Sequence, residues 1–336
     1  MDLTHLLIVG AGSVGKRHAR NLSALGCRIS CVDPREDRRW EMAAETPLAG
    51  DFISLDAALA QGRFDGVVVA APTAHHPHAT VAALEAGLPV LLEKPMARTA
   101  AEARDMLAAE RRTEVPVLLG YTWRWWPPLA RVRSQLAAGA IGPLRHVQFY
   151  MSAQLADWHP WEPYQSFFMA SAAEGGGALL DESHWIDLMI WLFGTPESLS
   201  ARVERISDLD IETDDNVDAL IVYPHGLRVS QHLDLYGRPH EKYIRFVGEN
   251  GTMVWSAEPN QIAIGRGMDQ TWETEPFDCE RNEMFMAVAR EYLEVIARRA
   301  RPSCTQEDGL RVMELVEAIR VSHAEGRTVT IGQSGS

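Results

Sequence analysis

Three closely spaced glycines near the start of the chain limit what it can fold into. Gly10, Gly12 and Gly15 have G-x-G-x-x-G spacing, directly after the apolar run Leu6–Val9 and at the start of a segment of helical composition. Glycines at this spacing allow a tight turn and the close approach of a pyrophosphate to a helix N-terminus. Asp33 ends the next apolar run, where a carboxylate can bind ribose hydroxyls. The pattern predicts a βαβ unit that binds a dinucleotide.

Charged residues after the second predicted strand bear on the choice of cofactor. The Asp33 carboxylate repels a 2′-phosphate, which favours NAD over NADP. Arg35, Arg38 and Arg39 follow closely, however, and one of these guanidinium groups could fold over such a phosphate. We therefore expect NAD as the cofactor, with NADP as an alternative.

Short β-branched runs alternate with alanine-rich helical stretches over the first 121 residues, which is typical of parallel βαβ units. The expected strands are Leu6–Val9, Arg28–Val32, Phe52–Leu55, Gly66–Ala70, Val90–Leu92 and Val115–Leu119. Gly26 and Gly87 lie where helix C-caps are expected, and Thr99–Glu102 has the sequence of a capping box. We predict a doubly wound parallel sheet, a Rossmann NAD(P)-binding domain, over residues 1–122.

The pattern changes after residue 122, where longer β-like runs are joined by short turns that favour antiparallel hairpins. The expected strands are Leu144–Ala153, Ser200–Ser207, Val217–Tyr223, Arg228–Tyr236, Tyr243–Gly248 and Thr252–Ser256. One helix is expected over Gly177–Phe193, and two more near 281–300 and 306–324. We predict that residues 123–336 form an α+β domain for substrate binding and oligomerisation, with a largely antiparallel open sheet. The whole chain would then be an α/β protein.

The overall charge excludes some classes of partner. The chain has 336 residues and a formal net charge of -14, which repels phosphate backbones and anionic lipids and argues against nucleic-acid and membrane partners. The N-terminus lacks the basic region and long apolar segment of a secretory signal, and no apolar run is long enough to span a membrane. The four cysteines form no C-x-x-C pair, so we expect reduced thiols in a cytoplasmic protein.

Five stretches occur along the chain in a characteristic order. They are GAGSVGKRHARNL, APTAHHPHA, EAGLPVLLEKPMA, GYTWRWWP and GGGALLDESHWIDLMIWLFG. In order and approximate spacing they resemble the Gfo/Idh/MocA oxidoreductases, the family of glucose-fructose oxidoreductase and inositol dehydrogenase, over nearly the whole chain. The resemblance implies hydride transfer between nicotinamide and a substrate carbon. It also implies a homodimer or homotetramer formed through the second sheet.

Lys94, in the triplet E-K-P, is expected where the nicotinamide meets the substrate. The resemblance implies this place, and a residue that follows a parallel strand also points into the crevice where open α/β sheets bind ligands. Its ammonium group could hydrogen-bond the reacting oxygen and stabilise negative charge there. The alternative is a surface lysine paired with Glu93.

The resemblance extends to further candidate residues. It implies that Pro72, Thr73 and His76 lie beside the cofactor, whereas His75 and His78 are expected to take no part. The full set of expected cofactor contacts is Gly10, Gly12, Ser13, Val14, Gly15, Asp33, Arg35, Pro72, Thr73, His76, Glu93, Lys94 and Arg124. The expected substrate contacts are Lys94, Tyr121, Asp157, Trp158, His159, Asp181 and His184.

The motif DESHWID supplies a second group of polar residues. Asp181, His184 and Asp187 are spaced i, i+3 and i+6, so a continuous helix would place them in one stripe. A histidine beside a carboxylate suits a proton acceptor for a hydroxyl whose carbon loses hydride, so Lys94, Asp181 and His184 are the expected catalytic residues. Many family members have Asp-x-x-x-His where this chain has Asp-x-x-His, which leaves open whether Asp181 or His184 faces the substrate oxygen. A structural hydrogen-bond network and a metal site are the alternatives, but no metal is expected, because the family chemistry needs none.

We interpret the chain as an NAD(P)-dependent oxidoreductase that acts on a secondary alcohol or ketone of a sugar, cyclitol or sugar derivative. An NAD-dependent glycoside hydrolase of the same superfamily and a nonenzymatic NAD-binding sensor or regulator are the alternatives. The segment Met151–Asp187 holds six acidic residues and no lysine or arginine, so a neutral or amino-bearing substrate is expected rather than a phosphorylated one. The sequence leaves the particular substrate, the reacting carbon and the direction of the reaction open.

Overall fold

The computed structural model describes residues 3–158, 162–268 and 271–332. The chain divides into two compact units, of which the first comprises Met1–Thr122 and Arg281–Met313. The second unit comprises Trp123–Glu280 and Glu314–Ser336. Residues 281–313 thus belong to the first unit and not, as the sequence pattern suggested, with the rest of 123–336.

The return of the chain to the first unit has a physical cause in helix α9, Arg281–Ile296. Tyr292 on this helix is fully buried, and its hydroxyl donates to the carbonyl oxygen of Val67 or of Pro89, at 2.9 and 2.8 Å. The helix also packs against α1, Ser13–Ala24. Tyr292 lies 225 and 203 positions from these two partners in the sequence, and local sequence patterns cannot reveal such contacts.

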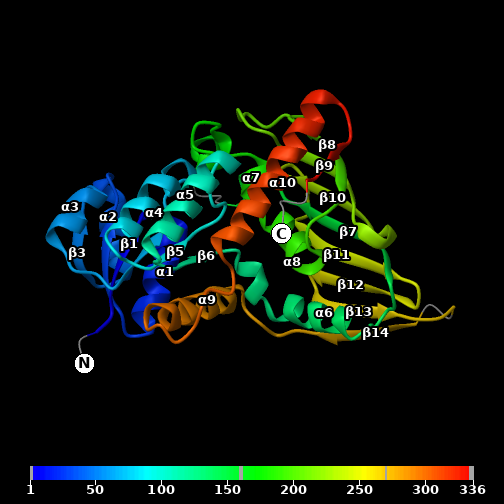
Figure 1. Cartoon of the computed structure of the whole chain (residues 1–336), viewed down its shortest axis with the longest axis horizontal. Coiled ribbons are helices and arrows are strands. Elements are labelled where there is room, and N and C mark those ends of the chain that lie inside the picture. Colours follow the sequence, from blue (N-terminus) through cyan, green and yellow to red (C-terminus); the bar gives the residue numbers. More distant parts are fainter. Residues whose placement is uncertain (1–2, 159–161, 269–270, 333–336) are drawn as a thin grey trace. The chain divides into compact units, whose positions relative to one another are not determined.

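A parallel sheet of six strands forms the centre of the first unit, in the order β3-β2-β1-β4-β5-β6 (Figure 1). The strands are β1 His5–Val9, β2 Arg28–Val32, β3 Leu48–Phe52, β4 Gly66–Val69, β5 Val90–Leu92 and β6 Val117–Leu119. All residues of β4, β5 and β6 are buried, as expected for strands covered on both faces. The order reverses at β1, between β2 and β4, which is the place where open sheets of this type bind ligands.

The first unit also contains helices. Besides α1 and α9 they are α2 Glu36–Glu45, α3 Leu55–Gln61, the short η1 Thr73–His75, α4 His76–Glu85, α5 Ala100–Thr113 and α10 Gln306–Glu325, which ends in the second unit. The predicted capping box of α5 is confirmed, because Thr99 Oγ1 accepts from the Glu102 N–H at 3.2 Å. The Glu102 carboxylate in turn accepts from the Arg98 N–H at 3.0 Å.

One predicted strand of the first unit is misplaced. The expected strand Phe52–Leu55 overlaps β3 only at Phe52, and Leu55 instead starts α3. The Ser54 hydroxyl caps this helix by accepting from the Ala57 N–H at 3.2 Å. The serine therefore ends the extended segment. Its preference for the N-cap of a helix prevails over the strand preference of the apolar residues around it.

A sheet of nine described strands forms the centre of the second unit, in the order β14-β13-β12-β11-β7-β10-β9-β8-β15 (Figure 1). The strands are β7 Leu144–Ser152, β8 Ser198–Glu204, β9 Asn216–Val222, β10 Arg228–Asp234, β11 Glu241–Gly248, β12 Gly251–Ala257, β13 Asn260–Gly265, β14 Trp272–Pro276 and β15 Val329–Thr330. Every neighbouring pair is antiparallel except β7 and β10, which are parallel. The predicted class, a parallel sheet followed by a largely antiparallel one, is confirmed.

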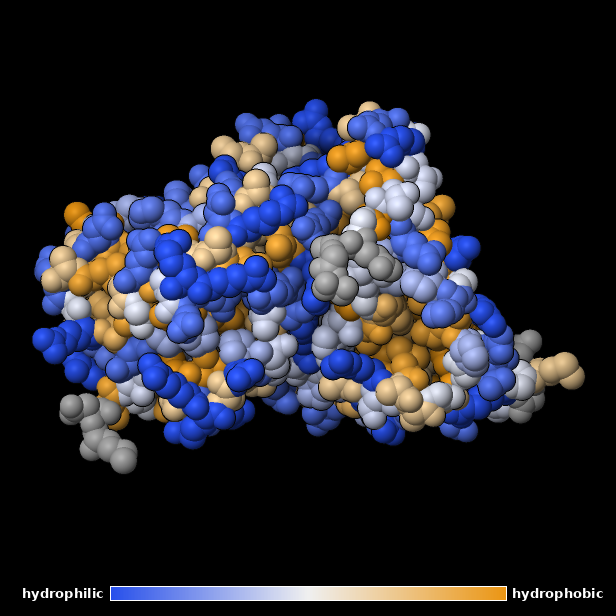
Figure 2. All heavy atoms as spheres, viewed as in Figure 1, coloured by the Kyte–Doolittle hydropathy of each residue, from blue (hydrophilic) through white to orange (hydrophobic). Residues whose placement is uncertain are grey.

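The two faces of the second sheet differ in what covers them. On one face lie α6 Pro127–Ala137, the short α7 Ala178–Asp181 and the apolar α8 His184–Phe193. Phe149 of β7 contacts Trp185 and Phe193 of α8, with ring centroids 6.2 and 6.4 Å apart. On the other face Tyr150 stacks on Tyr243, with centroids 4.9 Å apart, and Leu220 is 66% exposed. Figure 2 shows hydrophobic residues gathered at the surface where β11 to β13 lie.

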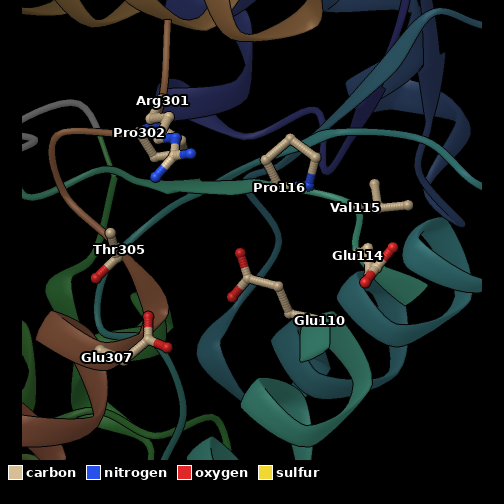
Figure 3. Close-up of a pocket in the computed structure, with 8 residues that line it drawn as sticks. All are labelled: Glu110, Glu114, Val115, Pro116, Arg301, Pro302, Thr305 and Glu307. Atoms are coloured by element: carbon tan, nitrogen blue, oxygen red, sulfur yellow. The ribbon is translucent and has the colours of Figure 1, made fainter. Parts of the chain in front are cut away.

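A hollow of about 360 Å³ lies in the first unit (Figure 3). Its lining residues are Glu110, Glu114, Val115, Pro116, Arg301, Pro302, Thr305 and Glu307. The Glu110 carboxylate accepts a hydrogen bond from the Val117 N–H at 3.0 Å. Burial raises the pKa of Glu110 to about 7, and the neighbouring Glu307 acts in the same direction. None of the residues expected at the cofactor or the substrate lines this hollow.

Glu110→Gln should make the stability of the protein less dependent on pH. A glutamate with an ordinary pKa of 4.5 in the unfolded chain and a pKa of about 7 in the folded protein keeps an extra proton when folded, so its contribution to stability falls as the pH rises between these values. Glutamine keeps an acceptor for Val117 and does not ionise. Between pH 5 and pH 8 the wild type should lose about 1–2 kcal/mol more unfolding free energy than the variant, measured in urea, a figure discounted for partial exposure.

Glu114→Gln is the matched control for this experiment, because Glu114 is exposed on the rim of the same hollow. This variant should keep the pH dependence of the wild type. An equal effect of both variants would show that the general charge of the rim, and not the half-buried Glu110, is responsible.

Candidate active site

The glycine turn of the first unit has the shape that a dinucleotide requires. Gly10 has φ +99°, and a Cβ there would lie 2.7 Å from the backbone of Ala70. A Cβ at Gly15 would lie 1.9 Å from the Gly10 carbonyl oxygen, so α1 and β1 meet backbone to backbone. Gly12 precedes the helix and offers no side-chain cap, and the first turn of α1 holds no acidic residue. The N–H groups of this turn, which includes the predicted Ser13 and Val14, are therefore suited to a pyrophosphate.

Asp33 ties the glycine turn to the end of β2. Its Oδ2 accepts from the Ala11 N–H at 2.8 Å and its Oδ1 from the Arg35 N–H at 2.9 Å. The carboxylate is only 8% exposed, so its position is fixed before a ribose arrives. Each carboxylate oxygen keeps a further lone pair with which to accept from a ribose hydroxyl.

The three arginines near Asp33 have different surroundings. Arg35 is paired with Asp37, with 3.1 Å between Nε and Oδ1. Arg39 is buried and donates to the Asp33 carbonyl oxygen at 2.6 Å and to Asp51 at 3.0 Å, which makes it a structural residue. Arg38 is the one beside the glycine turn, since a Cβ on Gly12 would lie 3.0 Å from its Nη1.

Lys94 follows β5 after one further residue and is half-buried. The preceding Glu93 is buried, its N–H donates to the Val69 carbonyl oxygen at 2.9 Å, and its Oε2 accepts from the Lys94 N–H at 3.2 Å. Glu93 Oε1 accepts from His18 Nε2 at 2.7 Å. Burial alone would raise the pKa of Glu93, but the hydrogen bond from His18 and the charge of Lys94 outweigh it and hold that pKa below its ordinary value.

His18 is a buried polar residue that the sequence analysis did not single out. The buried positions of α1 are Gly15, His18, Ala19, Asn21 and Leu22, which recur at helical spacing. This spacing could have identified His18 from the sequence, because it places the histidine on the buried side of the helix. A buried polar group needs a hydrogen-bond partner. The sequence could not show that this partner is Glu93, 75 positions away.

The P-T-x-x-H stretch lies between β4 and α4. Thr73 and His76 are buried, whereas Pro72, His75 and His78 are exposed. His76 Nδ1 lies 2.8 Å from the carbonyl oxygen of Pro95, and its Nε2 lies 2.9 Å from that of Ala71. The imidazole thus contacts the backbone directly after Lys94, and burial lowers its pKa. Tyr121, which follows β6 and was expected at the substrate, is fully buried.

The DESHWID segment of the second unit is not one helix, and the expected single stripe is wrong. Helix α7 ends at Asp181 and α8 begins at His184, with Glu182 and Ser183 between them. The Trp185 N–H donates to the Glu182 carbonyl oxygen at 3.0 Å, and its indole N–H donates to the Glu182 carboxylate at 2.9 Å. These bonds form a tight turn in place of a continued helix. Asp181 is buried and His184 is half-buried.

Asp187, on α8, is held by a cation of the second unit. Arg124 donates from Nη2 to Asp187 Oδ1 at 2.6 Å and from Nε to Oδ2 at 2.9 Å, and both side chains are buried. Arg124 was expected at the cofactor. Its guanidinium contacts a carboxylate 63 positions later in the chain, in the fork geometry that suits arginine, and its contact with the cofactor stays a prediction.

Asp157, an expected substrate contact, is also paired. Arg238 donates from Nε to its Oδ2 at 2.7 Å and from Nη2 to its Oδ1 at 2.8 Å, on an exposed surface. The hydrogen bonds from Arg238 lower the pKa of Asp157. The adjacent Trp158 is half-buried, and the expected contact His159 lies outside the described residues.

The described residues form neither a metal site nor a membrane span. Over residues 3–158, 162–268 and 271–332 no group of three or more His, Cys, Asp or Glu side chains converges in a way that could hold a metal ion. In the same ranges no helix combines the length and the apolar character needed to cross a membrane.

Two family models match the chain. A model described as "Oxidoreductase family, NAD-binding Rossmann fold" matches residues 4–121, and the model of the GFO/IDH/MocA C-terminal domain matches residues 129–254. The chain belongs to the GFO/IDH/MocA oxidoreductase family. Its first unit is therefore an NAD-binding Rossmann domain, as predicted, and the NAD cofactor expected from Asp33 is confirmed.

Several named proteins resemble this chain. D-apiose dehydrogenase of Rhizobium rhizogenes is 25% identical over 359 residues, which cover 99% of this chain and 99% of that protein. The rhizopine catabolism protein MocA of Rhizobium meliloti is 34% identical over 201 residues, 58% of each chain. A solved structure of levoglucosan dehydrogenase with NADH and levoglucosan has a TM-score of 0.88 and 20% identity, covering 99% of this chain and 100% of that one. The structural likeness shows a shared fold.

Asp33→Ser should weaken NAD binding and narrow the preference for NAD over NADP. The variant removes the carboxylate held by Ala11 and Arg35 and the negative charge that repels a 2′-phosphate. We expect the KM for NAD to rise about tenfold, the equivalent of one hydrogen bond to a charged group. Initial rates with both cofactors provide the measurement. Asp105→Ser, on the exposed side of α5, is the control and should leave both values unchanged. A wild type that uses NADP better than NAD would contradict the assignment.

Proposed function

We propose that this family member is an NAD-dependent dehydrogenase that oxidises a secondary alcohol of a neutral sugar or cyclitol, or reduces the corresponding ketone. The observation that carries the proposal is Lys94, half-buried just beyond β5 of an NAD-binding sheet, with its backbone N–H held by Glu93. Relatives and neighbours named for apiose, inositol and levoglucosan support this class of substrate.

The proposed roles fall on three residues of the chain. Bound NAD would supply the hydride acceptor. Lys94 donates a hydrogen bond to the reacting oxygen and stabilises the negative charge that develops there. His184 at the start of α8 accepts the hydroxyl proton, and Asp181 at the end of α7 is its carboxylate partner.

Charge pairing in the second unit supports a substrate without a phosphate group. Arg124 is bound to Asp187 and Arg238 to Asp157, so each of these two cations already contacts a carboxylate. A phosphate that is buried away from water needs a cation, because neutral donors recover its desolvation cost poorly. Trp158, half-buried beside Asp157, offers a flat apolar face for the ring of a neutral sugar.

We also propose a homodimer or homotetramer, formed through the exposed face of the second sheet. Tyr150 and Tyr243 form a flat aromatic stack on this face, and Leu220 projects from it with 66% of its surface exposed. Contiguous exposed apolar surface on a soluble protein marks an interaction site.

We also propose that the protein is located in the cytoplasm. The net charge of -14 and the four free cysteines support this location.

A panel of substrates tests the proposed activity. Reduction of NAD and of NADP should be followed with D-apiose, myo-inositol and levoglucosan, and with matched sugars that carry a phosphate or nucleotide group. We expect turnover of a neutral member with NAD. A strong preference for the phosphorylated or nucleotide-linked partner would contradict the substrate class. Cleavage of a glycosidic bond with recycling of NAD would indicate a glycoside hydrolase, and tight NAD binding without any turnover would indicate a sensor.

Lys94→Met should separate binding from catalysis. The variant keeps a side chain of similar length but removes the donor to the reacting oxygen. Turnover should fall about a hundredfold or more, the scale for one preorganised charge-stabilising donor, while calorimetry should show nearly unchanged NAD affinity. Lys16→Met is the matched control, because Lys16 is paired with Glu41 at 2.8 Å on the surface of α1. Near-normal turnover of Lys94→Met would exclude the catalytic role.

A further inference from the structure

A buried hydrogen bond links the helix of the glycine turn to the segment that carries Lys94. His18 on α1 donates from Nε2 to Glu93 Oε1 at 2.7 Å, and the other carboxylate oxygen, Oε2, accepts from the Lys94 N–H at 3.2 Å. The His18 side chain is 0% exposed and that of Glu93 is 10% exposed. The Glu93 carboxylate therefore spans the distance between the helix and the backbone of Lys94.

The surroundings of His18 hold its imidazole in place. Its Nε2 donates to Glu93 Oε1 at 2.7 Å, and its Nδ1 is buried without a hydrogen-bond partner in the part of the chain that the structure describes. Phe285 of α9 packs its ring against the imidazole, with centroids 6.0 Å apart. The imidazole therefore has a fixed position from which it stabilises the Glu93 anion.

The segment after Lys94 is also held by an imidazole. His76 Nδ1 lies 2.8 Å from the Pro95 carbonyl oxygen, and both His76 and Pro95 are buried. The backbone of Lys94 is thus fixed on its N-terminal side through Glu93 and on its C-terminal side through Pro95.

We propose that His18 is a positioning residue for Lys94, acting through the Glu93 carboxylate. It keeps Glu93 ionised inside the sheet, so that the carboxylate holds the Lys94 backbone and keeps a negative charge near the Lys94 ammonium group. This proposal rests on the proposed catalytic role of Lys94. It adds a residue of the glycine-turn helix to the groups that position Lys94, the hydrogen-bond donor to the reacting oxygen.

Removing the imidazole has a definite electrostatic consequence. In His18→Leu the buried Glu93 loses its side-chain donor, so burial dominates and the carboxylate takes up a proton. Lys94 then loses a nearby negative charge, and its backbone N–H faces a neutral acid instead of an anion. His18→Gln keeps an N–H donor toward Glu93 and should retain most of the wild-type behaviour.

The small number of lysines makes the test direct. The chain has only Lys16, Lys94 and Lys242, so a protein labelled with ¹³C-lysine gives one Cε signal for each of them. In His18→Leu the Lys94 signal should titrate with a pKa lowered by about one unit, the scale of a lost neighbouring charge. The Lys242 signal should not move, and the Lys16 signal, from the same helix as His18, should stay unchanged if α1 is intact. This measurement needs no substrate, so it stands even if the proposed sugar activity fails.

Kinetics supply the second readout. For His18→Leu we expect kcat to fall about tenfold or more while the KM for NAD changes less than about twofold, since a lost positioning contact acts on the chemical step. Glu93→Gln and the double variant complete a cycle in which the double variant should lose no more than the worse single variant. Asn21→Leu is the matched control, because Asn21 is buried on α1 and bonds Asn282 instead of Glu93. It should leave kcat and the Lys94 titration unchanged.

Several outcomes would overturn the proposal. An unchanged Lys94 titration in His18→Leu would show that Glu93 needs no help from His18, and independent, additive losses in the cycle would show that His18 does not act through Glu93. Failure of His18→Gln to retain more activity than His18→Leu would point to packing alone. If His18→Leu does not fold, Glu93→Gln decides the question with the same two readouts, and an unchanged Lys94 titration and kcat in that variant would contradict the proposal.

Discussion

The close contact between α1 and β1 determines the positions of several residues around the glycine turn. A Cβ at Gly15 would lie 1.9 Å from the Gly10 carbonyl oxygen, so the helix can take its direction only when both positions lack side chains. The same turn brings the Ala11 N–H onto the Asp33 carboxylate at the end of β2. One turn of helix later it brings His18 onto Glu93 at the end of β5. A single steric constraint thus aligns the helix that follows β1 with groups at the ends of β2 and β5.

The sequence predicted the parts of the fold that depend on local patterns. The buried runs of β1, β4 and β5 and the capping box at Thr99 follow from apolar content and capping chemistry, and the structure has them there. The break between α7 and α8 was missed because it depends on bonds between Glu182 and Trp185 within an otherwise helical pattern. Strands β13 and β14 were also missed. All five residues of β14 are half-buried or exposed, so their weak hydrophobic pattern carries little signal.

In the candidate site, too, local motifs could be predicted and contacts between distant residues could not. The glycine spacing and Asp33 could be predicted because each motif is local and has a physical reason for its residue types. The ion pairs of Asp187 and Asp157 could not be predicted, because Arg124 reaches Asp187 over 63 positions and Arg238 reaches Asp157 over 81. Sequence reasoning identified the acidic residues as available for substrate. It had no means of showing that distant arginines neutralise two of them.

The place of α9 also has a consequence for the order in which the protein is made. Tyr292 covers the Val67 and Pro89 carbonyl oxygens, and a Cβ at Gly66 would lie 2.4 Å from its hydroxyl, so the sheet is shaped around this late residue. During synthesis, residues 1–122 and then 123–280 emerge from the ribosome before α9 does. The first unit to be synthesised is therefore completed only after most of the second has emerged, and until then one side of its sheet lacks a covering helix.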